Sequence, residues 1–292
     1  MAQQVQAPEA RRVNWIPLAD PNWGVGGRIA AVMVAAIVLV AIFAPLLAPY
    51  PYDAQDIPNR LQGPSQEYLL GTDQFGRDLL SRVIYGTRIA LTTALPAIGL
   101  ALGAGLVLGL LAGYLGGAID TVIVLILDTL QAFPGVILAL AILALAGPSS
   151  LVYVLGLTFI PGYARVIRAQ VLSARSQPYV QAQRGLGAGH LRILFGHIFP
   201  NVVAPVIVLA AMDIPSVITL EAGLSFLGMG VPPPSPSWGV MLSEGFQYMR
   251  QSPWQIIWAG AALVVTTLSI TLFGEALRRV LDPRSSNERG GA

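Results

Sequence analysis

Long apolar stretches constrain the fold of this chain more than any other feature. The first, residues 29–48, has no charged side chain, and a helix needs about 20 apolar residues to cross the hydrocarbon core of a bilayer. Further apolar stretches follow at residues 89–115, 119–146, 151–164, 202–227 and 254–273. The sequence therefore predicts an all-α membrane protein with six transmembrane helices.

The composition excludes a large soluble domain. Hydrophobic residues make up 54% of the chain and charged residues 11%, whereas soluble domains carry about 25% charged residues. So few polar side chains could not cover the surface of a soluble domain of 292 residues. The chain has no Cys, which excludes disulfides, Cys-ligated metals and thiol nucleophiles.

The first apolar stretch has two interpretations, a transmembrane helix or a cleaved signal peptide. The apolar core of a signal peptide is only about 7–15 residues long. The stretch here is longer, begins late and is followed by APYPYD rather than by a small-residue cleavage site. We therefore expect a transmembrane helix at residues 29–48, preceded by a polar tail at residues 1–28.

A loop rich in Pro, Asp and Gln follows and leads into the stretch GTDQFGRDLLSRVIYGTR, residues 71–88. Thr72 or Asp73 is a candidate N-cap for a helix in this stretch. The side chains divide into an apolar face (Leu79, Leu80, Val83 and Ile84) and a polar face (Asp78, Ser81 and Arg82). This division predicts a helix that lies on the membrane surface, within an extracytoplasmic region at residues 49–88.

Glycines recur at every fourth position of the second apolar stretch, at Gly105, Gly109, Gly113 and Gly117. This spacing gives a helix a flat stripe on which another helix can pack closely. Gly is also generally frequent in membrane helices, which is the simpler explanation. Four glycines in register favour close packing.

The distribution of Arg predicts the orientation. All 17 basic residues are Arg, and all but Arg60, Arg77, Arg82, Arg88 and Arg250 lie in the two tails or in residues 165–192. Positive side chains are enriched on the cytoplasmic side of membrane proteins. We therefore expect both termini, including a tail at residues 278–292, and the loop at residues 165–201 to be cytoplasmic.

The stretch YVQAQRGLGAGHLRILFGHIFPN, residues 179–201, is amphipathic and lies between apolar runs. Pro178 favours a helix start, and we expect a short helix at residues 179–186. Gly187 and Gly189 are expected to end it with positive φ angles, before a second helix at residues 190–199. Tyr179, Ala182, Gln183 and Leu186 would share one face of the short helix. That face suits insertion into a cleft on a partner, although an ordinary interfacial helix has the same pattern.

No candidate for chemistry stands out. A phosphate-binding GxxxxGK[ST] loop needs a Lys, which the chain lacks. Its two His, His190 and His197, are too few for a His-rich metal site, and we expect structural or partner-facing roles for them. The sequence therefore predicts a protein that is not an enzyme and holds no cofactor or metal.

Three stretches resemble known sequences. Residues 179–201 resemble the E-A-A-x3-G-x9-I-x-L-P loop of ABC importer permeases. The matching positions are Ala182, Gly187 and Pro200, while Gln181, Gln183, His197 and Phe199 depart from the pattern. LLGTDQFGRDLLSRVIYGTRIAL, residues 69–91, and LEAGLSFLGMGVPPPSPSWGVML, residues 220–242, resemble the dipeptide/oligopeptide permease family more specifically. The chain is therefore identified as similar to this family from residue 29 onward.

The resemblance implies a type I ABC importer permease fold, with a permease core at residues 89–277. Besides the lipid bilayer, it implies three kinds of protein partner: a sister permease, two ATP-binding subunits and an extracytoplasmic substrate-binding protein. It implies no nucleic acid. ATP and Mg would be bound by the ATP-binding subunits. The residues in the position that couples to the ATPase are Gln181, Ala182, Gln183, Arg184 and Gly187. Gln181 replaces the family's Glu and carries no charge, so Arg184 is a candidate for part of that polar contact.

Three carboxylates lie in or near predicted spans: Asp128, Asp213 and Glu221. Charged groups are costly in the membrane core, so they usually face a cavity or a partner. In an importer they could line the translocation path and contact the amino group of a peptide. They could equally form hydrogen bonds between helices.

Several functional alternatives remain open at this stage. Nickel and glutathione importers use similar permeases, and the sequence does not identify the solute. A stand-alone channel or secondary transporter is a second class, but no internal repeat supports it. A membrane scaffold or receptor is a third, although the chain has no sizeable soluble domain to display.

Overall fold

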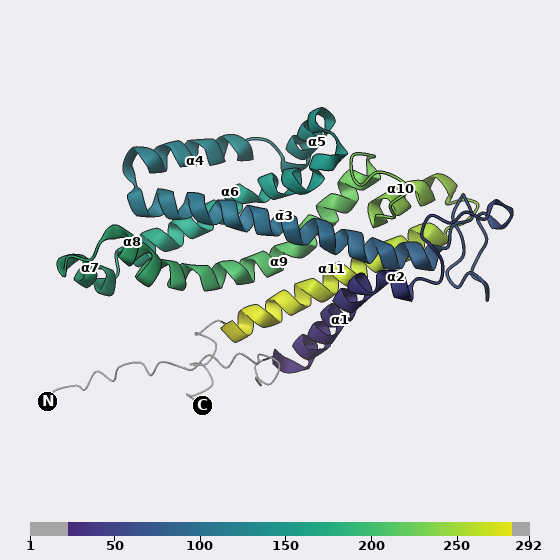
Figure 1. The fold of residues 1–292 in the computed structure, drawn as a ribbon, viewed down its shortest axis with the longest axis horizontal. Coiled ribbons are helices and arrows are strands. Elements are labelled where there is room, and N and C mark those ends of the chain that lie inside the picture. The colour runs from purple at the N-terminus through teal and green to yellow at the C-terminus, as the bar shows by residue number, and fades with distance from the viewer. Residues whose placement is uncertain (1–22, 282–292) are drawn as a thin grey trace.

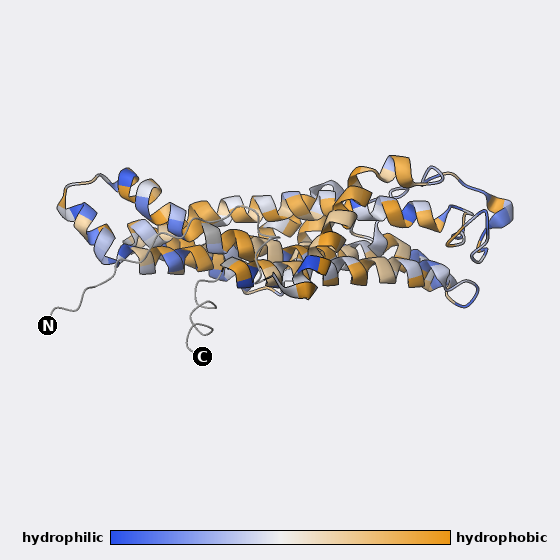
Figure 2. Ribbon diagram, turned by 90° about the horizontal axis from the view of Figure 1, so that it is seen from below, coloured by the Kyte–Doolittle hydropathy of each residue, from blue (hydrophilic) through white to orange (hydrophobic). Residues whose placement is uncertain are grey.

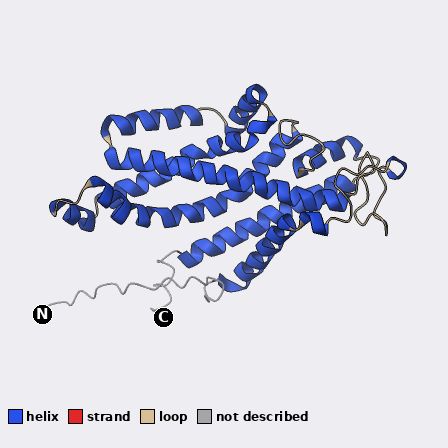
Figure 3. Ribbon diagram, in the orientation of Figure 1, coloured by secondary structure: helices blue, strands red, loops and turns tan. Residues whose placement is uncertain are grey.

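The computed structural model describes residues 23–281, and every regular element in that range is a helix (Figure 3). Most helices run along one long axis and form a bundle with an apolar middle and polar ends (Figure 2). One end holds the loop at residues 49–78 and helix α10 (Trp238–Tyr248), and the other holds helix α7 (Pro178–Gly185) (Figure 1). We call these the α10 end and the α7 end. The predicted tail residues 1–22 and 282–292 lie outside the described range.

The remaining helices complete the bundle. In chain order they are α1 (Gly24–Ile42), α2 (Ala44–Leu47), η3 (Ile57–Asn59), α3 (Leu79–Leu115), α4 (Gly117–Gln131), α5 (Gly135–Ala146), η4 (Pro148–Ser150), α6 (Leu151–Arg175), α8 (His190–Ile193), the π-helical turn η5 (Leu194–Ile198), α9 (Phe199–Phe226) and α11 (Trp254–Leu281). Five of these segments are individually long and apolar enough to cross a membrane. They are Gly24–Ile42, Leu79–Leu115, Pro148–Arg175, Pro205–Phe226 and Trp254–Val280.

The sixth crossing is the bent pair α4 and α5, whose axes differ by 87° across Pro134. The start of α1 and the end of α11 lie side by side. A Cβ added to Gly27 would lie 2.8 Å from that of Ala276, and the rings of Trp23 and Phe273 are 5.5 Å apart. Because both described ends lie on one side, the number of crossings is even. The pair α4–α5 therefore counts as one span, as the sequence predicts.

The predicted surface helix is wrong as a separate element. Residues 79–88 form the first turns of α3, which continues without a break to Leu115. The N-cap is Asp78, whose side chain accepts a hydrogen bond from the backbone N–H of Ser81, and not Thr72 or Asp73. The polar face of these turns is buried rather than solvated, since Arg82 is only 1% exposed. Its charge is balanced by acidic residues from other segments.

Close packing through glycine joins α3 to α6. A Cβ on Gly105, Gly109 or Gly113 would lie within 3 Å of atoms of α6, the nearest being Tyr163, Ala164 and Val171 respectively. The prediction of a packing stripe is confirmed for these three positions. Gly117 departs from it because its φ of +58° places it in the reversal between α3 and α4.

Helix is also found in two stretches outside the predicted spans. α6 extends to Arg175, so Arg165 and Arg168 lie on a helix and not in the polar loop assigned to them. The Pro-rich stretch at residues 228–253 contains α10, which begins at Ser237, an N-cap that accepts from the N–H of Val240. Both extensions bring charged side chains against neighbouring helices.

Candidate functional site

The segment at the α7 end is built as two short helices around a glycine turn. Pro178 is the first residue of α7, where its missing N–H costs nothing. Gly187 has a φ of +79°, and its N–H donates to the carbonyl of Arg184 over 3.0 Å. Gly189 has a φ of −66°, so the prediction of a positive angle there is wrong. One left-handed residue is enough to end the helix, since Ala188 donates to the carbonyl of Gln183.

The residues predicted to couple to an ATPase lie on this segment. Gln181, Ala182, Arg184 and Gly187 are exposed, and Gln183 is half-buried. The amide of Gln181 donates to the carbonyl of Ser176 over 3.3 Å, a local contact that leaves its carbonyl oxygen accessible. No charged group of the described chain forms an ion pair with Arg184.

Large apolar side chains of the same segment are also exposed. Tyr179 is 43%, Leu186 79%, Leu191 72% and Phe195 57% accessible. The segment is nevertheless fixed to the bundle, because Val180 and Ile193 are buried in its core. An exposed apolar surface next to uncharged and basic groups, carried on an anchored segment, is suited to contact another protein.

Tyr114 connects this segment to α3. Its hydroxyl lies 3.0 Å from Nδ1 of His190, and the guanidinium of Arg184 lies 6.0 Å from its ring centroid. Arg175 of α6 donates to the carbonyls of Gly113 and Tyr114 over 3.3 and 3.1 Å. These carbonyls belong to the last turn of α3, where a positive charge is favourable.

Two ion pairs connect α4 to α6. Arg168 makes two hydrogen bonds to Asp120, of 2.5 and 2.7 Å. Arg165 contacts Asp128 over 2.5 Å, but both side chains are about half exposed. Asp128, predicted as a path residue, therefore has a partner on α6. The stronger pair involves Asp120, which the sequence analysis did not single out.

The other two predicted path residues lie on α9. Asp213 is half-buried and faces the hydroxyl of Tyr163 on α6, without a well-formed hydrogen bond between them. Glu221 is 2% exposed and accepts a hydrogen bond of 2.6 Å from Ser225. Within residues 23–281 no three acidic or His side chains converge as a metal site would require. The structure does not bring the three acids together in this chain.

An open groove of about 640 Å³ lies between α5, α9 and α11. Its polar lining consists of hydroxyls (Ser216, Thr219, Thr267 and Thr271), and neither Asp213 nor Glu221 lines it. Thr219 and Thr271 donate to carbonyls of their own helices. The groove is therefore mainly apolar.

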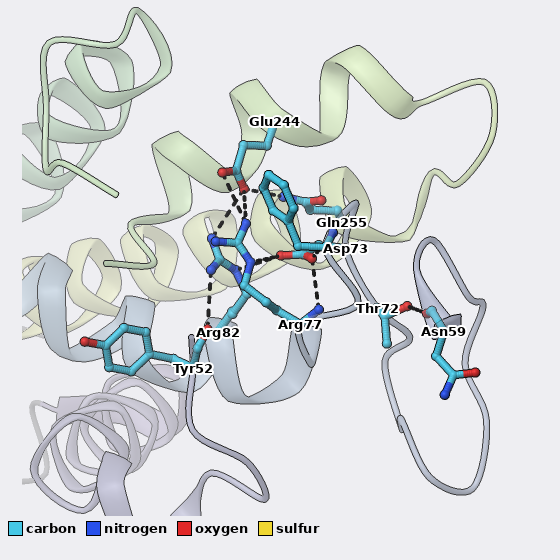
Figure 4. A network of polar contacts seen from close by, with 9 residues as sticks. Tyr52, Asn59, Thr72, Asp73, Arg77, Arg82, Glu244 and Gln255 are labelled. Carbon is cyan, nitrogen blue, oxygen red and sulfur yellow. Dashed lines mark hydrogen bonds and ion pairs between the residues drawn. The ribbon is translucent and has the colours of Figure 1, made fainter. Parts of the chain in front are cut away.

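A buried ion cluster occupies the α10 end (Figure 4). Arg77 contacts Asp73 over 2.5 Å, and Arg82 contacts the same carboxylate over 3.4 Å. Both guanidiniums also reach Glu244 on α10, over 3.2 and 3.3 Å, and Gln255 on α11 donates to Glu244. Asp73 is fully buried and Arg82 nearly so. Two positive and two negative groups thus join the loop, α3, α10 and α11.

The loop at this end has its own hydrogen bonds. The side chains of Asn59 and Tyr68 both donate to Asp56 over 2.8 Å and hold the pKa of that carboxyl below its usual range. The same hydrogen bond, together with burial, raises the pKa of Tyr68 to about 12. Thr72 donates to the carbonyl of Asn59. The loop therefore has a defined structure next to the ion cluster.

The sequence held partial signals for these features. Asp73 and Arg77 are four residues apart, and Arg82 follows five residues later. All three lie within residues 69–91, the stretch that resembles the permease family. Nothing local to Glu244 indicates that it completes the cluster, because it lies 162 residues from Arg82. Tyr114 and His190 are similarly remote, 76 residues apart.

Comparison with known families gives two matches. Residues 105–287 match the family described as binding-protein-dependent transport system inner membrane component. Residues 26–64 match the N-terminal TM domain of oligopeptide transport permease C. The first match covers more than half of the chain, including α7 and the groove, and the second covers α1 and part of the following loop.

Curated relatives align with most of the chain. A dipeptide transport system permease protein of Escherichia coli strain K12 is 43% identical over 267 residues, covering 89% of each sequence. A di/tripeptide transport system permease protein of Pseudomonas aeruginosa strain UCBPP-PA14 is 37% identical over 288 residues, covering 96% of this chain and 94% of the relative. A dipeptide transport system permease protein of Alkalihalophilus pseudofirmus is 39% identical over 258 residues, covering 88% and 85%.

Proposed function

The chain belongs to the family of binding-protein-dependent transport system inner membrane components, and we propose that it is one permease subunit of an ATP-driven importer of peptides. It is a multi-pass membrane protein with the type I ABC permease fold. The observation that carries the proposal is the exposed α7–α8 segment, residues 176–198, which presents Gln181, Ala182 and Arg184 at one end of the bundle. Peptides are proposed as substrates because the relatives are described as peptide permeases.

In this proposal the subunit works only as part of a complex. A sister permease would form the other half of the translocation path, and two ATP-binding subunits would each contact one permease. A substrate-binding protein would deliver the peptide from outside. The chain itself would contribute no ATPase site, since it has no Lys for a phosphate-binding loop.

The α7 end is proposed to face the cytoplasm. Positive side chains are enriched on the cytoplasmic side. Five Arg residues lie on the second half of α6, which leads into α7, and on α7 and α8: Arg165, Arg168, Arg175, Arg184 and Arg192. Both termini would then be cytoplasmic, because the start of α1 and the end of α11 lie next to each other and on the side of the bundle toward α7 (Figure 1).

The proposed mechanism is a switch between two states. Closure of the ATP-binding subunits would carry the α7–α8 segment with it, and the attached helices would tilt. The path between the two permeases would open alternately to each side. ATP and substrate drive such a switch only through different affinities for the two states.

The experiment that tests the function combines isolation and transport. The tagged chain is purified from its native membrane in mild detergent, its partners are identified by mass spectrometry, and the complex is reconstituted into liposomes. We expect a second permease, two ATP-binding subunits, and ATP-dependent uptake of labelled dipeptides in the presence of the binding protein. Isolation of the chain alone, or flux that needs no ATP, would contradict the proposal in favour of a channel or secondary transporter. Nickel and glutathione are included in the substrate panel.

Asp213 is proposed to line the path, because it is the one predicted acid that is half-buried and forms no ion pair in the described structure. In an Asp213→Ala variant we expect a severalfold fall in peptide uptake while the complex still assembles. Asp128→Ala is the matched control, since Asp128 already pairs with Arg165. Unchanged uptake in Asp213→Ala, or loss of the complex itself, would argue against a path role.

A further inference from the structure

We propose that Tyr114 and His190 form a joint that passes movement of the α7–α8 segment to α3 and α6. This inference rests on the proposed function and names the contact within the chain through which coupling would act. Tyr114 is 6% exposed and lies one residue before the end of α3. His190 is the first residue of α8 and is exposed.

Tyr114 is held from both helices of the segment. Its hydroxyl and Nδ1 of His190 are 3.0 Å apart, and the two rings meet edge to face with centroids 5.8 Å apart and planes at 79°. Arg184, from α7, places its guanidinium 6.0 Å from the centroid of the tyrosine ring. A displacement of either α7 or α8 therefore acts on the same side chain.

No other side-chain hydrogen bond joins residues 176–198 to α3 within the part of the chain that the structure describes. The remaining ones are local or reach α6 and α9. Gln181 donates to Ser176, Ser176 donates to Ser173, and Asn201 donates to Tyr179 and to the carbonyl of His197. In the described part of the chain, the pair of Tyr114 and His190 is thus the one side-chain hydrogen bond between the segment and α3.

The position of Tyr114 determines what the joint would move. Gly116, with a φ of +70°, caps the end of α3 two residues after Tyr114. Arg175 binds the carbonyl of Tyr114 and so fixes the last turn of α3 to α6. Just before Tyr114 along α3, Gly109 and Gly113 pack directly against α6. A pull on Tyr114 would therefore act on α3 and α6 as one unit.

The test measures how many ATP molecules the reconstituted complete complex hydrolyses for each labelled dipeptide that it imports. Tyr114→Phe removes the hydroxyl and keeps the ring. We expect about a three- to tenfold rise in ATP hydrolysed per peptide, in line with the loss of one partly buried hydrogen bond. ATPase activity itself should change little. Tyr153→Phe is the control, since Tyr153 is 66% exposed on α6 with no hydrogen bond from its hydroxyl in the described structure.

A second pair of variants separates a joint from a merely structural contact. His190→Ala removes the partner, whereas His190→Asn restores a polar atom near the position of Nδ1. We expect the asparagine variant to hydrolyse fewer ATP molecules per peptide than the alanine variant. An unchanged ratio in both Tyr114→Phe and His190→Ala would overturn the inference, and so would a proportional fall of ATPase activity and uptake. If the unaltered complex imports no peptide, the proposed function fails and the inference with it.

Discussion

The two ends of α3 are held in different ways. At the α10 end, Arg82 is 1% exposed and, with Arg77, contacts a fully buried Asp73 and the carboxylate of Glu244 on α10. At the α7 end, Tyr114 makes one side-chain hydrogen bond, and its partner His190 is exposed. The helix between them has 37 residues and is about 55 Å long. One helix therefore connects a buried ionic cluster to an end whose side-chain hydrogen bond has an exposed partner.

The difference indicates which end is fixed and which can move. Buried ion pairs lose much free energy when one partner is displaced, so the α10 end resists rearrangement. A single hydrogen bond with one exposed partner contributes little and can follow a moving segment. We expect a force applied to the α7–α8 segment to tilt α3 about its α10 end. The predictions below test this comparison, starting with the largest expected effect.

Removing a charge from the buried cluster should have the largest effect. In Asp73→Ala, Arg77 and Arg82 lose their shared buried partner, and removal of one member of a buried pair costs about 3–5 kcal/mol. We expect the free energy of unfolding of the purified protein in detergent to fall by that amount. Denaturant titration followed by circular dichroism would measure it.

The matched control is Asp53→Ala in the same loop. Asp53 is exposed and its side chain has no hydrogen bond in the described structure, so its loss should change stability by less than about 0.5 kcal/mol. If the two variants were equally stable, the cluster would not fix the α10 end.

A substitution in the second half of α3 tests whether α3 and α6 form one unit. A Cβ at Gly109 would lie 2.7 Å from both the carbonyl oxygen of Ala164 and Cβ of Ile167. Overpacking of this kind costs about 1–3 kcal/mol, so Gly109→Ala should be destabilised. A Cβ added at Gly103 meets nothing within 4 Å. Gly103→Ala should therefore raise the free energy of unfolding by about 0.5–1 kcal/mol, because Ala loses less conformational entropy than Gly on folding. If the free energy of unfolding changed in the same direction in both variants, the predicted tight contact at Gly109 would be contradicted.

The smallest stability effect is expected at the α7 end. Arg175→Gln removes the charge that binds the last carbonyls of α3, and such a charge contributes about 0.3–1 kcal/mol. Arg192→Gln serves as control because Arg192 is exposed and makes no hydrogen bond from its side chain in the described structure. If Arg175→Gln lowered the free energy of unfolding as much as Asp73→Ala does, the contrast between the two ends of α3 would disappear.

The sequence predicts the crossings better than it predicts the contacts between them. Apolar length is a local property, and the spans follow from it. The surface helix expected within residues 71–88 is wrong because its polar face looks solvated in isolation. Arg82 is buried because Asp73 and Glu244 balance its charge, and Glu244 lies 162 residues away. Pattern alone cannot show such a partner.

The candidate coupling residues illustrate the same limit at the α7 end. Pro178 and Gly187 mark the boundaries of α7 through fixed backbone preferences, and the structure confirms both. The contact between Tyr114 and His190 depends on how α3 and α8 meet in space, which no spacing in the sequence reveals. Coupling and path roles for the named residues remain predictions.

The most direct test of the account measures distances at both ends of α3 in the complete complex. The chain has no native Cys, so spin labels can be placed at introduced Cys residues while the other subunits are used in cysteine-free form. One pair, Leu115→Cys with Val25→Cys, reports on the α7 end, and the other, Leu69→Cys with Phe246→Cys, spans the ion cluster; all four positions are exposed. Between the nucleotide-free state and a state trapped with an ATP analogue, we expect the first distance to change by several ångström and the second to stay constant. An equal change in both distances, or no change in either, would contradict an importer subunit that tilts about a fixed α10 end.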